Sequence, residues 1–300
     1  MNVCVFKILI SGNSGFVGNN LSISLKEKGC AVERVSLRNK WILTKTAQAI
    51  IHLAGKAHDT ANTTSESEYF EVNTELTKKL FDDFLNSDIK DFFYFSSVKA
   101  TADTVNEILD ENHISNPKTP YGKSKLMAEE YLLSKDLPLG KRLFIIRPCM
   151  IHGPGNKGNL NLLYKVVEKG IPWPLASFEN KRSFLSIDNL NFIIFEMLNR
   201  DISSGIYNIA DDESLSTNQL VKLISKTIGK KEKLWKLPSK LITNLAFLGD
   251  KINLPLNSER LKKLTESYQV SNAKIKKALG IENLPVSAEE GLMKTIKSFK

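Results

Sequence analysis

Val3-Cys-Val-Phe-Lys-Ile-Leu-Ile10 runs directly into Ser11-Gly12-Asn13-Ser14-Gly15-Phe16-Val17-Gly18, and a stretch of helical character then reaches Lys28. A strand, a glycine turn and a helix in this order are the context of a dinucleotide-binding fingerprint. Gly12 permits the tight turn, Gly15 lets a pyrophosphate approach, and Gly18 lets the helix pack closely. The helix N-terminus offers free N–H groups to the anion. A plain structural turn is the alternative. We predict an α/β fold with a doubly wound, Rossmann-type parallel sheet.

The second expected strand, Ala31 to Leu37, follows Gly29, which ends the helix. The end of this strand normally carries an acid that binds the adenosine ribose of NAD. Here Arg38 follows, without an acid. Arg38 could accept the 2′-phosphate of NADP, which favours NADP over NAD, or it could be a solvated loop charge.

The connection to the next apolar run is short. Only residues 39 to 48 separate the second strand from Ala49-Ile-Ile-His-Leu-Ala-Gly55. A parallel crossover needs a dozen or more residues. We therefore expect a sheet that lacks its usual third strand, with residues 31 to 37 at the edge and an open adenine pocket.

Bulk composition narrows the class of protein. A chain of 300 residues, 42% of them apolar, can bury a large core. It contains no apolar run of membrane-span length, and residues 1 to 10 lack a signal peptide's features, so we expect a cytoplasmic protein. The cysteines are odd in number, and neither they nor the histidines have metal-ligand spacing, so we expect no metal site. These residues are Cys4, Cys30, Cys149, His52, His58, His113 and His152.

The net charge is +9. Such an excess suits anionic ligands such as dinucleotides and sugar nucleotides. The basic residues are scattered and form no stripe interleaved with aromatic residues, so we expect no nucleic-acid partner.

Candidate chemistry lies in Tyr121-Gly-Lys-Ser-Lys125. Residues four apart on a helix share a face, so the Lys125 ammonium can sit beside the Tyr121 phenol. A nearby cation lowers a tyrosine pKa, which would make Tyr121 a proton carrier near neutral pH. Chance spacing of a solvated lysine and a half-buried tyrosine is the alternative. The aromatic strand that begins at Asp91 ends in Ser96 and Ser97, which can supply a hydroxyl.

With these motifs, the chain resembles an extended short-chain dehydrogenase/reductase of the NAD-dependent epimerase/dehydratase family. Arg147-Pro148, Ile151-His-Gly-Pro-Gly155, Asn159-Leu160 and Lys181-Arg-Ser-Phe184 extend the resemblance along the chain. It implies that Ser97, Tyr121 and Lys125 are catalytic, whereas Ser96 is packed. It also implies that Asn159 and Arg182 hold the substrate, together with Ser97. The implied cofactor-binding residues are Gly12, Gly15, Phe16, Val17, Gly18, Arg38, Leu53, Ala54, Gly55, Tyr121, Lys125 and Pro148. His52 and Asn73 are expected to be structural.

A second, smaller and mainly helical substrate lobe should follow. We expect helical segments at 217–228, 237–248, 258–266, 273–279 and 288–299. The segment 237–248 could lie on a membrane surface, but packing inside the lobe is favoured. We assign residues 1–153 and 183–210 to the dinucleotide-binding domain, and residues 154–182 and 211–300 to the lobe.

The resemblance implies an enzyme that acts at C4 of a UDP-hexose, and it suggests a homodimer. The family's dehydratases carry an Asp-Glu pair where Val98 and Lys99 stand here, which disfavours dehydration. An open adenine pocket suits an exchanging cofactor and favours reduction of a UDP-4-keto-6-deoxy-N-acetylhexosamine. A UDP-glucose or UDP-GlcNAc 4-epimerase with retained NAD is the alternative. A non-catalytic dinucleotide sensor or scaffold is a third hypothesis.

Overall fold

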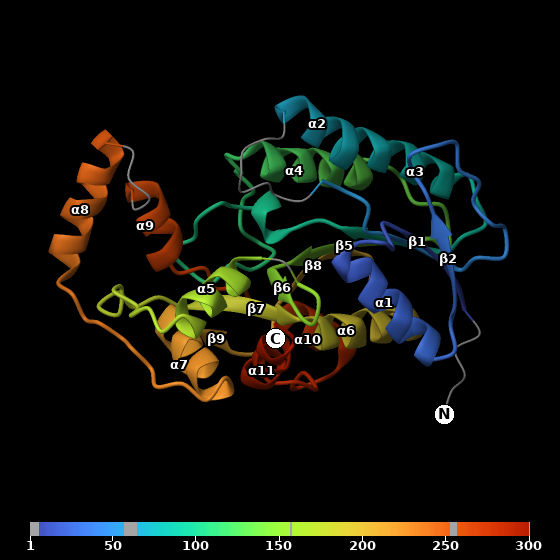
Figure 1. The fold of residues 1–300 in the computed structure, drawn as a ribbon. Coiled ribbons are helices and arrows are strands. Elements are labelled where there is room, and N and C mark those ends of the chain that lie inside the picture. Colours follow the sequence, from blue (N-terminus) through green and yellow to red (C-terminus); the bar gives the residue numbers. More distant parts are fainter. Residues whose placement is uncertain (1–5, 57–64, 157, 253–256, 300) are drawn as a thin grey trace.

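The computed structural model describes residues 6–56, 65–156, 158–252 and 257–299. Cys4 and His58, and the start of the expected first strand, lie outside these residues. Six parallel strands form the main sheet (Figure 1). In spatial order they are β2 (Ala31–Val35), β1 (Lys7–Ser11), β3 (Ala49–His52), β4 (Asp91–Phe95), β5 (Arg142–Pro148) and β8 (Gly205–Ile209).

β2 is the edge strand of this sheet. It pairs in parallel with β1, with Lys7 opposite Ala31, and the other side of β1 pairs with β3. The short connection from residue 39 to residue 48 contains no strand or helix. The expected loss of the usual third strand is therefore confirmed.

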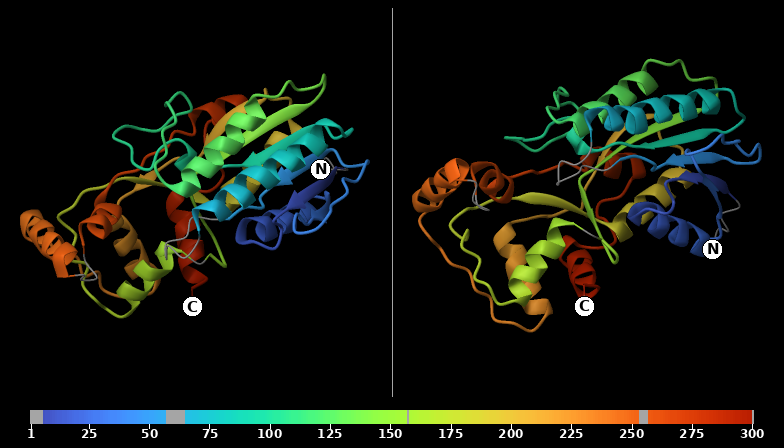
Figure 2. Two further views of the ribbon diagram at one scale, coloured as in Figure 1. Left: turned by 90° about the horizontal axis from the view of Figure 1, so that it is seen from above. Right: turned by 45° about the horizontal axis from the view of Figure 1, so that its top comes forward.

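Helices cover both faces of the sheet, as an apolar parallel sheet requires (Figures 1 and 2). On one face, α1 (Phe16–Glu27) and α6 (Ile187–Asn199) pack against Ile8 and Ile10. On the other face, α3 (Leu76–Leu85) and α4 (Pro120–Leu133) pack against Leu9 and Ile50. Alternate residues of β1 thus enter opposite cores. The predicted Rossmann-type architecture is confirmed.

A helical segment of three parts crosses the second face. α2 (Glu66–Phe70) leads into a π-helical turn, η1 (Glu71–Glu75), which continues into α3. Single π-turns within α-helices often lie at functional sites. This turn contains Asn73, and its contacts are described below.

A separate hydrophobic core includes residues that the sequence assigned to both domains, such as Phe184 and Leu220, and we call the part of the fold around this core the second lobe. A small sheet is formed by β6 (Met150–His152), β7 (Arg182–Ser186) and β9 (Ser214–Leu215). Around it lie α5 (Asn159–Glu168), α7 (Thr217–Thr227), α8 (Ser239–Ile252), α9 (Ser258–Thr265) and α11 (Ala288–Lys297). In contrast, α10 (Ala273–Leu279) packs on β8, and Ile275 joins the core of the main sheet.

α8 differs from expectation. Only one side of it, including Ile242 and Ala246, packs into the lobe core. Leu245 and Phe247 are exposed. Packing inside the lobe, which the sequence favoured, therefore describes only half of this helix. Among the helices of the described residues, none combines the length and the apolar character needed to cross a bilayer.

Candidate functional site

The carboxyl ends of the parallel strands bring the candidate residues to one edge of the sheet. β1 ends at Ser11, β3 at His52, β4 at Phe95 and β5 at Pro148. The glycine turn, residues 53 to 55 and Ser97 follow three of these strands directly. In open α/β sheets, ligands bind at this edge.

Two glycines of the first turn are required by its geometry. Gly12 has φ +73°, and a Cβ there would lie 2.6 Å from the backbone nitrogen of Ala54. A Cβ on Gly18 would lie 2.4 Å from the carbonyl oxygen of Gly12. The expected tight turn and close helix packing are therefore confirmed.

Gly15 is placed differently, and its surroundings fit a pyrophosphate. It is exposed, and a Cβ there would meet only the carbonyl oxygen of Gly12, at 3.4 Å. It is the N-cap of α1, where no side chain caps the helix and the first turn has no acid. The free N–H groups can therefore donate hydrogen bonds to an anion. The binding role of Gly15 stays a prediction.

The segment after β3 touches both the glycine turn and the candidate catalytic helix. Ala54 donates its backbone N–H to the hydroxyl of Ser11, 3.2 Å away. A Cβ on Gly55 would lie 3.2 Å from the ammonium nitrogen of Lys125. Packing within the protein therefore requires a small residue at Gly55, independently of any cofactor.

Ser97 and Tyr121 are hydrogen-bonded to each other. Ser97 caps a short 3₁₀ turn, η2 (Val98–Ala100), and its hydroxyl accepts the backbone N–H of Lys99 at 3.1 Å. Tyr121 is the second residue of α4 and packs edge-on against Tyr69, with ring centroids 6.1 Å apart. The structure thus brings together two residues separated by 23 intervening positions.

The pKa of Tyr121 departs from the expected direction. Burial raises this pKa, the hydrogen bond with Ser97 acts in the opposite direction, and Tyr69 adds to the rise. The net result is a raised pKa, so the expectation that Lys125 lowers it is wrong for this structure. Desolvation of the phenolate is the largest cause of the shift, and Lys125 is not among its causes.

Lys125 is buried and tied to the strand that precedes Ser97. Its ammonium donates to the carbonyl oxygen of Phe95 at 2.8 Å and lies 5.0 Å from the ring centroid of Tyr94. Burial lowers the pKa of Lys125 to about 8, and nearby Glu129 partly offsets the shift.

Gly122 sets how closely α4 approaches the loop that contains Ser97, and the sequence did not predict this role. A Cβ on Gly122 would lie 2.4 Å from the carbonyl oxygen of Lys99. A glycine next to a candidate catalytic tyrosine was visible in the sequence, but its partner was not.

A buried ion pair between Arg147 and Glu129 joins β5 to α4. Glu129 accepts from Arg147 Nε at 3.0 and 3.1 Å, and a further bond runs from Arg147 Nη2. Ser96 also donates to Glu129, so its predicted packed role is confirmed. The sequence held one signal that Glu129 belongs to this region: it lies four residues after Lys125, on the same face of the helix.

His52 and Asn73 are structural, as expected. The His52 ring bonds to Ser11 Oγ at 2.6 Å and to Thr77 Oγ1 at 2.8 Å, and burial lowers its pKa to about 3. The Asn73 amide donates to Ser124 Oγ at 3.0 Å and accepts the N–H of Lys56 at 2.7 Å. The π-helical turn therefore holds α4 and the segment after β3 together.

Arg182, the candidate diphosphate ligand, lies at the start of β7. Its Nη2 donates to the carbonyl oxygen of Lys263 at 2.7 Å and lies 3.9 Å from Glu266. Burial lowers the pKa of Arg182. Burial lowers the pKa of Lys99, and the positive charge of Arg182 contributes to the shift. The start of β7 therefore lies near the loop that contains Ser97.

The remaining candidate residues lie at separate places in the fold. Arg38 is exposed in the turn after β2. The ring of Phe16 lies beside Gly153, and Val17 packs on the main core. Asn159 begins α5, but its side chain lies outside the described residues. Pro148 is buried at the end of β5.

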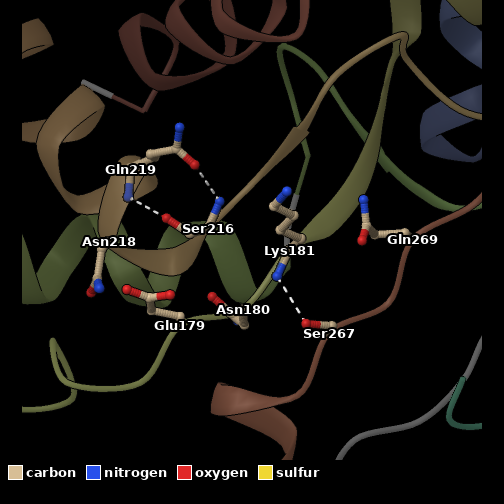
Figure 3. A pocket seen from close by; sticks show the side chains of 8 residues that line it. All are labelled: Glu179, Asn180, Lys181, Ser216, Asn218, Gln219, Ser267 and Gln269. Carbon is tan, nitrogen blue, oxygen red and sulfur yellow. Dashed lines mark hydrogen bonds between the residues drawn. The ribbon is translucent and has the colours of Figure 1, made fainter. Parts of the chain in front are cut away.

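A polar pocket of about 470 Å³ lies beside Arg182 (Figure 3). It is lined by the segment before β7, the start of α7 and the segment after α9. Its residues are Glu179, Asn180, Lys181, Ser216, Asn218, Gln219, Ser267 and Gln269. Lys181 donates its backbone N–H to Ser267 Oγ at 3.0 Å. Ser97 and Tyr121 are not part of this lining. In the described part of the chain, no three His, Cys, Asp or Glu side chains are grouped to hold a metal ion.

The fold and its glycine turn define a protein of the Rossmann type. A family description, NAD dependent epimerase/dehydratase family, matches residues 8–210, and the chain belongs to this family. It is 28% identical to a UDP-glucose 4-epimerase of Vibrio cholerae, over 97% of this chain and 95% of the relative.

Two further relatives have related activities. An N-acetyl-alpha-D-glucosaminyl-diphospho-ditrans,octacis-undecaprenol 4-epimerase of Escherichia coli O157:H7 is 31% identical over 76% of this chain and 66% of the relative. A UDP-2-acetamido-2,6-beta-L-arabino-hexul-4-ose reductase of Pseudomonas aeruginosa is 32% identical over 67% and 51%, respectively. The protein is therefore an NAD(P)-dependent enzyme of a family that acts on nucleotide sugars.

Solved structures share the fold. A UDP-N-acetylglucosamine 4-epimerase from Bacillus cereus superposes with TM-score 0.77 at 20% identity, over 98% of this chain and 99% of that one. The structure of RMD from Pseudomonas aeruginosa, complexed with NADPH, gives TM-score 0.75 at 18% identity, over 98% and 99%.

Proposed function

We propose that the protein reduces a UDP-4-keto-6-deoxy-N-acetylhexosamine at C4, with NADPH as reductant, in the cytoplasm and for surface polysaccharide biosynthesis. The observation that carries the proposal is the hydrogen bond between Ser97 and Tyr121, next to buried Lys125, at the sheet edge that holds the glycine turn. The exposed edge strand β2 and Arg38 after it favour an exchanging, phosphorylated cofactor.

The side chains have separable roles in this reaction. When bound, the reduced nicotinamide would supply a hydride to the C4 carbonyl carbon. Ser97 holds the C4 oxygen of the substrate by a hydrogen bond, and Tyr121 gives that oxygen its proton. A raised pKa keeps the Tyr121 phenol protonated and therefore ready to act as an acid. Lys125, fixed to the Phe95 carbonyl, places a positive charge beside the site.

Substrate recognition is assigned to the second lobe. Arg182 can exchange its bond with the Lys263 carbonyl for a bidentate bond to a diphosphate. Asn159 would contact the nucleotide half. Lys99 occupies a position where the family's dehydratases have an acid, and its ammonium donates to the carbonyl of Asp103 at 2.6 Å. A cation held in this way supplies no acid/base pair for elimination.

A 4-epimerase with retained NAD is the second candidate. It is favoured by the Vibrio relative, which matches nearly the whole chain. The relative named for an undecaprenol-linked diphosphate sugar widens the candidate substrates, because Arg182 would recognise the diphosphate that both substrate classes share. The scaffold hypothesis is set aside, because the curated relatives reported above are enzymes.

One pair of incubations separates the candidates. The purified protein is mixed with UDP-4-keto-6-deoxy-GlcNAc and NADPH, and separately with UDP-GlcNAc or UDP-glucose without added cofactor. We expect NADPH consumption in the first mixture. Interconversion of the C4 epimers in the second mixture, with no NADPH consumed in the first, would select the epimerase.

A further inference from the structure

The outer face of α8 is apolar and exposed. Leu241, Leu245 and Leu248 are 49%, 46% and 48% exposed and follow the i, i+4, i+7 spacing of one helical face. Phe247, on the neighbouring side, is 59% exposed. Ile242 and Ala246 already fill the core contact of this helix, so the exposed leucines are not needed to fold the lobe.

The place of α8 in the molecule makes this face accessible. All three views show α8 at the end of the second lobe, on the far side from the main sheet (Figures 1 and 2). It packs on α9, whose Leu261 joins the same core. A contiguous apolar face of this kind on a protein surface marks an interaction site.

The charges around α8 indicate what covers it. Residues 239–263, from the start of α8 through most of α9, contain four lysines and one arginine against two acids. Lys240 and Lys251, on α8 itself, are exposed, and the Lys251 ammonium lies 5.0 Å from the ring centroid of Phe247. Leucine and phenylalanine beside lysines are the composition of helices that lie in the plane of an anionic membrane surface.

A second copy of the chain is a poorer partner. A two-fold contact through α8 would set the same patch against itself. It would therefore bring Lys240 and Lys251 of both copies together, and like charges repel. Asp250, the acid on α8, is already bonded to Ser258. An anionic bilayer instead accepts both the leucines and the lysines.

We propose that α8 docks this protein on the surface of an anionic lipid bilayer. Leu241, Leu245, Phe247 and Leu248 enter the boundary between headgroups and acyl chains, and Lys240 and Lys251 contact lipid phosphates. α9 lies between α8 and Arg182, which bonds to the Lys263 carbonyl. The docked lobe therefore carries the candidate diphosphate site one helix away from α8. The proposal concerns binding and stands whether or not the C4 chemistry is as proposed.

Vesicle co-sedimentation of the full chain tests the proposal. Vesicles of phosphatidylcholine alone are compared with vesicles that contain about 30% phosphatidylglycerol, at about 0.1 M and about 0.5 M salt. We expect binding to the anionic vesicles, weakened by salt. The double change Leu245→Ser and Leu248→Ser should reduce that binding about tenfold or more. Charge reversal by Lys240→Glu and Lys251→Glu should weaken it mainly at the lower salt concentration.

Control variants remove at least as much exposed apolar surface elsewhere. Ile114 and Leu139 are 93% and 106% exposed, outside α8, so Ile114→Ser and Leu139→Ser should leave vesicle binding unchanged. Circular dichroism checks that every variant is folded. The proposal is overturned if the parent protein does not sediment with anionic vesicles, or if the controls lose binding as fully as the α8 variants. It is also overturned if the α8 changes convert a dimer to a monomer without lipid, because a second copy then covers the helix.

Discussion

The ammonium nitrogen of Lys125 lies 2.8 Å from the carbonyl oxygen of Phe95, two residues before Ser97. This bond ties α4, which also carries Tyr121, to the end of β4. This contact between a helix and a strand therefore helps to fix the relative positions of three candidate catalytic side chains.

Replacement of the candidate proton donor should stop turnover but not binding. For Tyr121→Phe we expect kcat to fall by roughly 10²- to 10⁴-fold, because the phenol supplies the proton. Cofactor affinity, measured by fluorescence titration, should change little. Tyr131→Phe is the matched control. Tyr131 lies nearer the end of α4, and its hydroxyl donates to Asp82 on α3 at 2.7 Å. Equal losses in the two variants would contradict a catalytic role.

The pH profile should show the titration of Lys125. Its pKa is about 8, so we expect kcat for reduction to decline above pH about 8 as the ammonium is lost. In Lys125→Met that decline should be absent and activity low throughout. Because the folded pKa lies below the ordinary value of 10.5, the unfolded chain binds this proton more tightly. The penalty on folding is full below pH about 8 and diminishes toward pH 10.5.

The close approach of Gly122 to Lys99 predicts a positional effect. Gly122→Ala places a Cβ 2.4 Å from the Lys99 carbonyl oxygen, so α4 must move away from the Ser97 loop. Small misplacements of reacting groups cost about 10²-fold in rate, and we expect a loss of that order in kcat. Lys123→Ala, an exposed change one residue later, should be neutral. Wild-type kcat in Gly122→Ala would show that the loop contact does not position Tyr121.

Breaking the buried ion pair should destabilise the fold. Arg147→Met leaves Glu129 buried without its cation, which costs about 3–5 kcal/mol in the free energy of unfolding. Lys263→Met removes the exposed pair with Glu259 and should cost less than about 1 kcal/mol. Urea unfolding measures both. A loss below about 1 kcal/mol in Arg147→Met would mean that Glu129 is satisfied in another way.

Arg38 tests the choice of cofactor. If it binds a 2′-phosphate, Arg38→Ala should raise KM for NADPH by about tenfold or more and leave KM for NADH unchanged. Lys40→Ala, an exposed change in the same loop, is the control. Equal changes in KM for NADPH and for NADH would instead indicate that Arg38 is a solvated charge in the loop.

The sequence predicted those features that depend on local patterns. The run from Val3 to Gly18 indicated the strand, turn and helix, and the short connection from residue 39 to residue 48 predicted the edge position of β2. The helical spacing of Tyr121 and Lys125 placed both on α4. Each of these predictions depends on residues that are close in sequence or on the number of residues available for a connection.

Features that depend on tertiary packing were not predictable in this way. The pKa of Tyr121 is set by burial, which a helical spacing does not reveal. Glu129 meets Arg147 across 18 residues, and Gly122 meets Lys99 across 23. The apolar composition of α8 resembled that of a core helix, although only one side of it is covered.

Transfer of an isotope to the sugar tests the central claim most directly. The protein is incubated with UDP-4-keto-6-deoxy-GlcNAc and NADPH that carries deuterium at the transferable position of the nicotinamide, and the product is examined by NMR. We predict deuterium at C4 of the hexose, one atom for each cofactor oxidised, with Tyr121→Phe almost inactive. Deuterium at another carbon, or full transfer by Tyr121→Phe, would contradict the account.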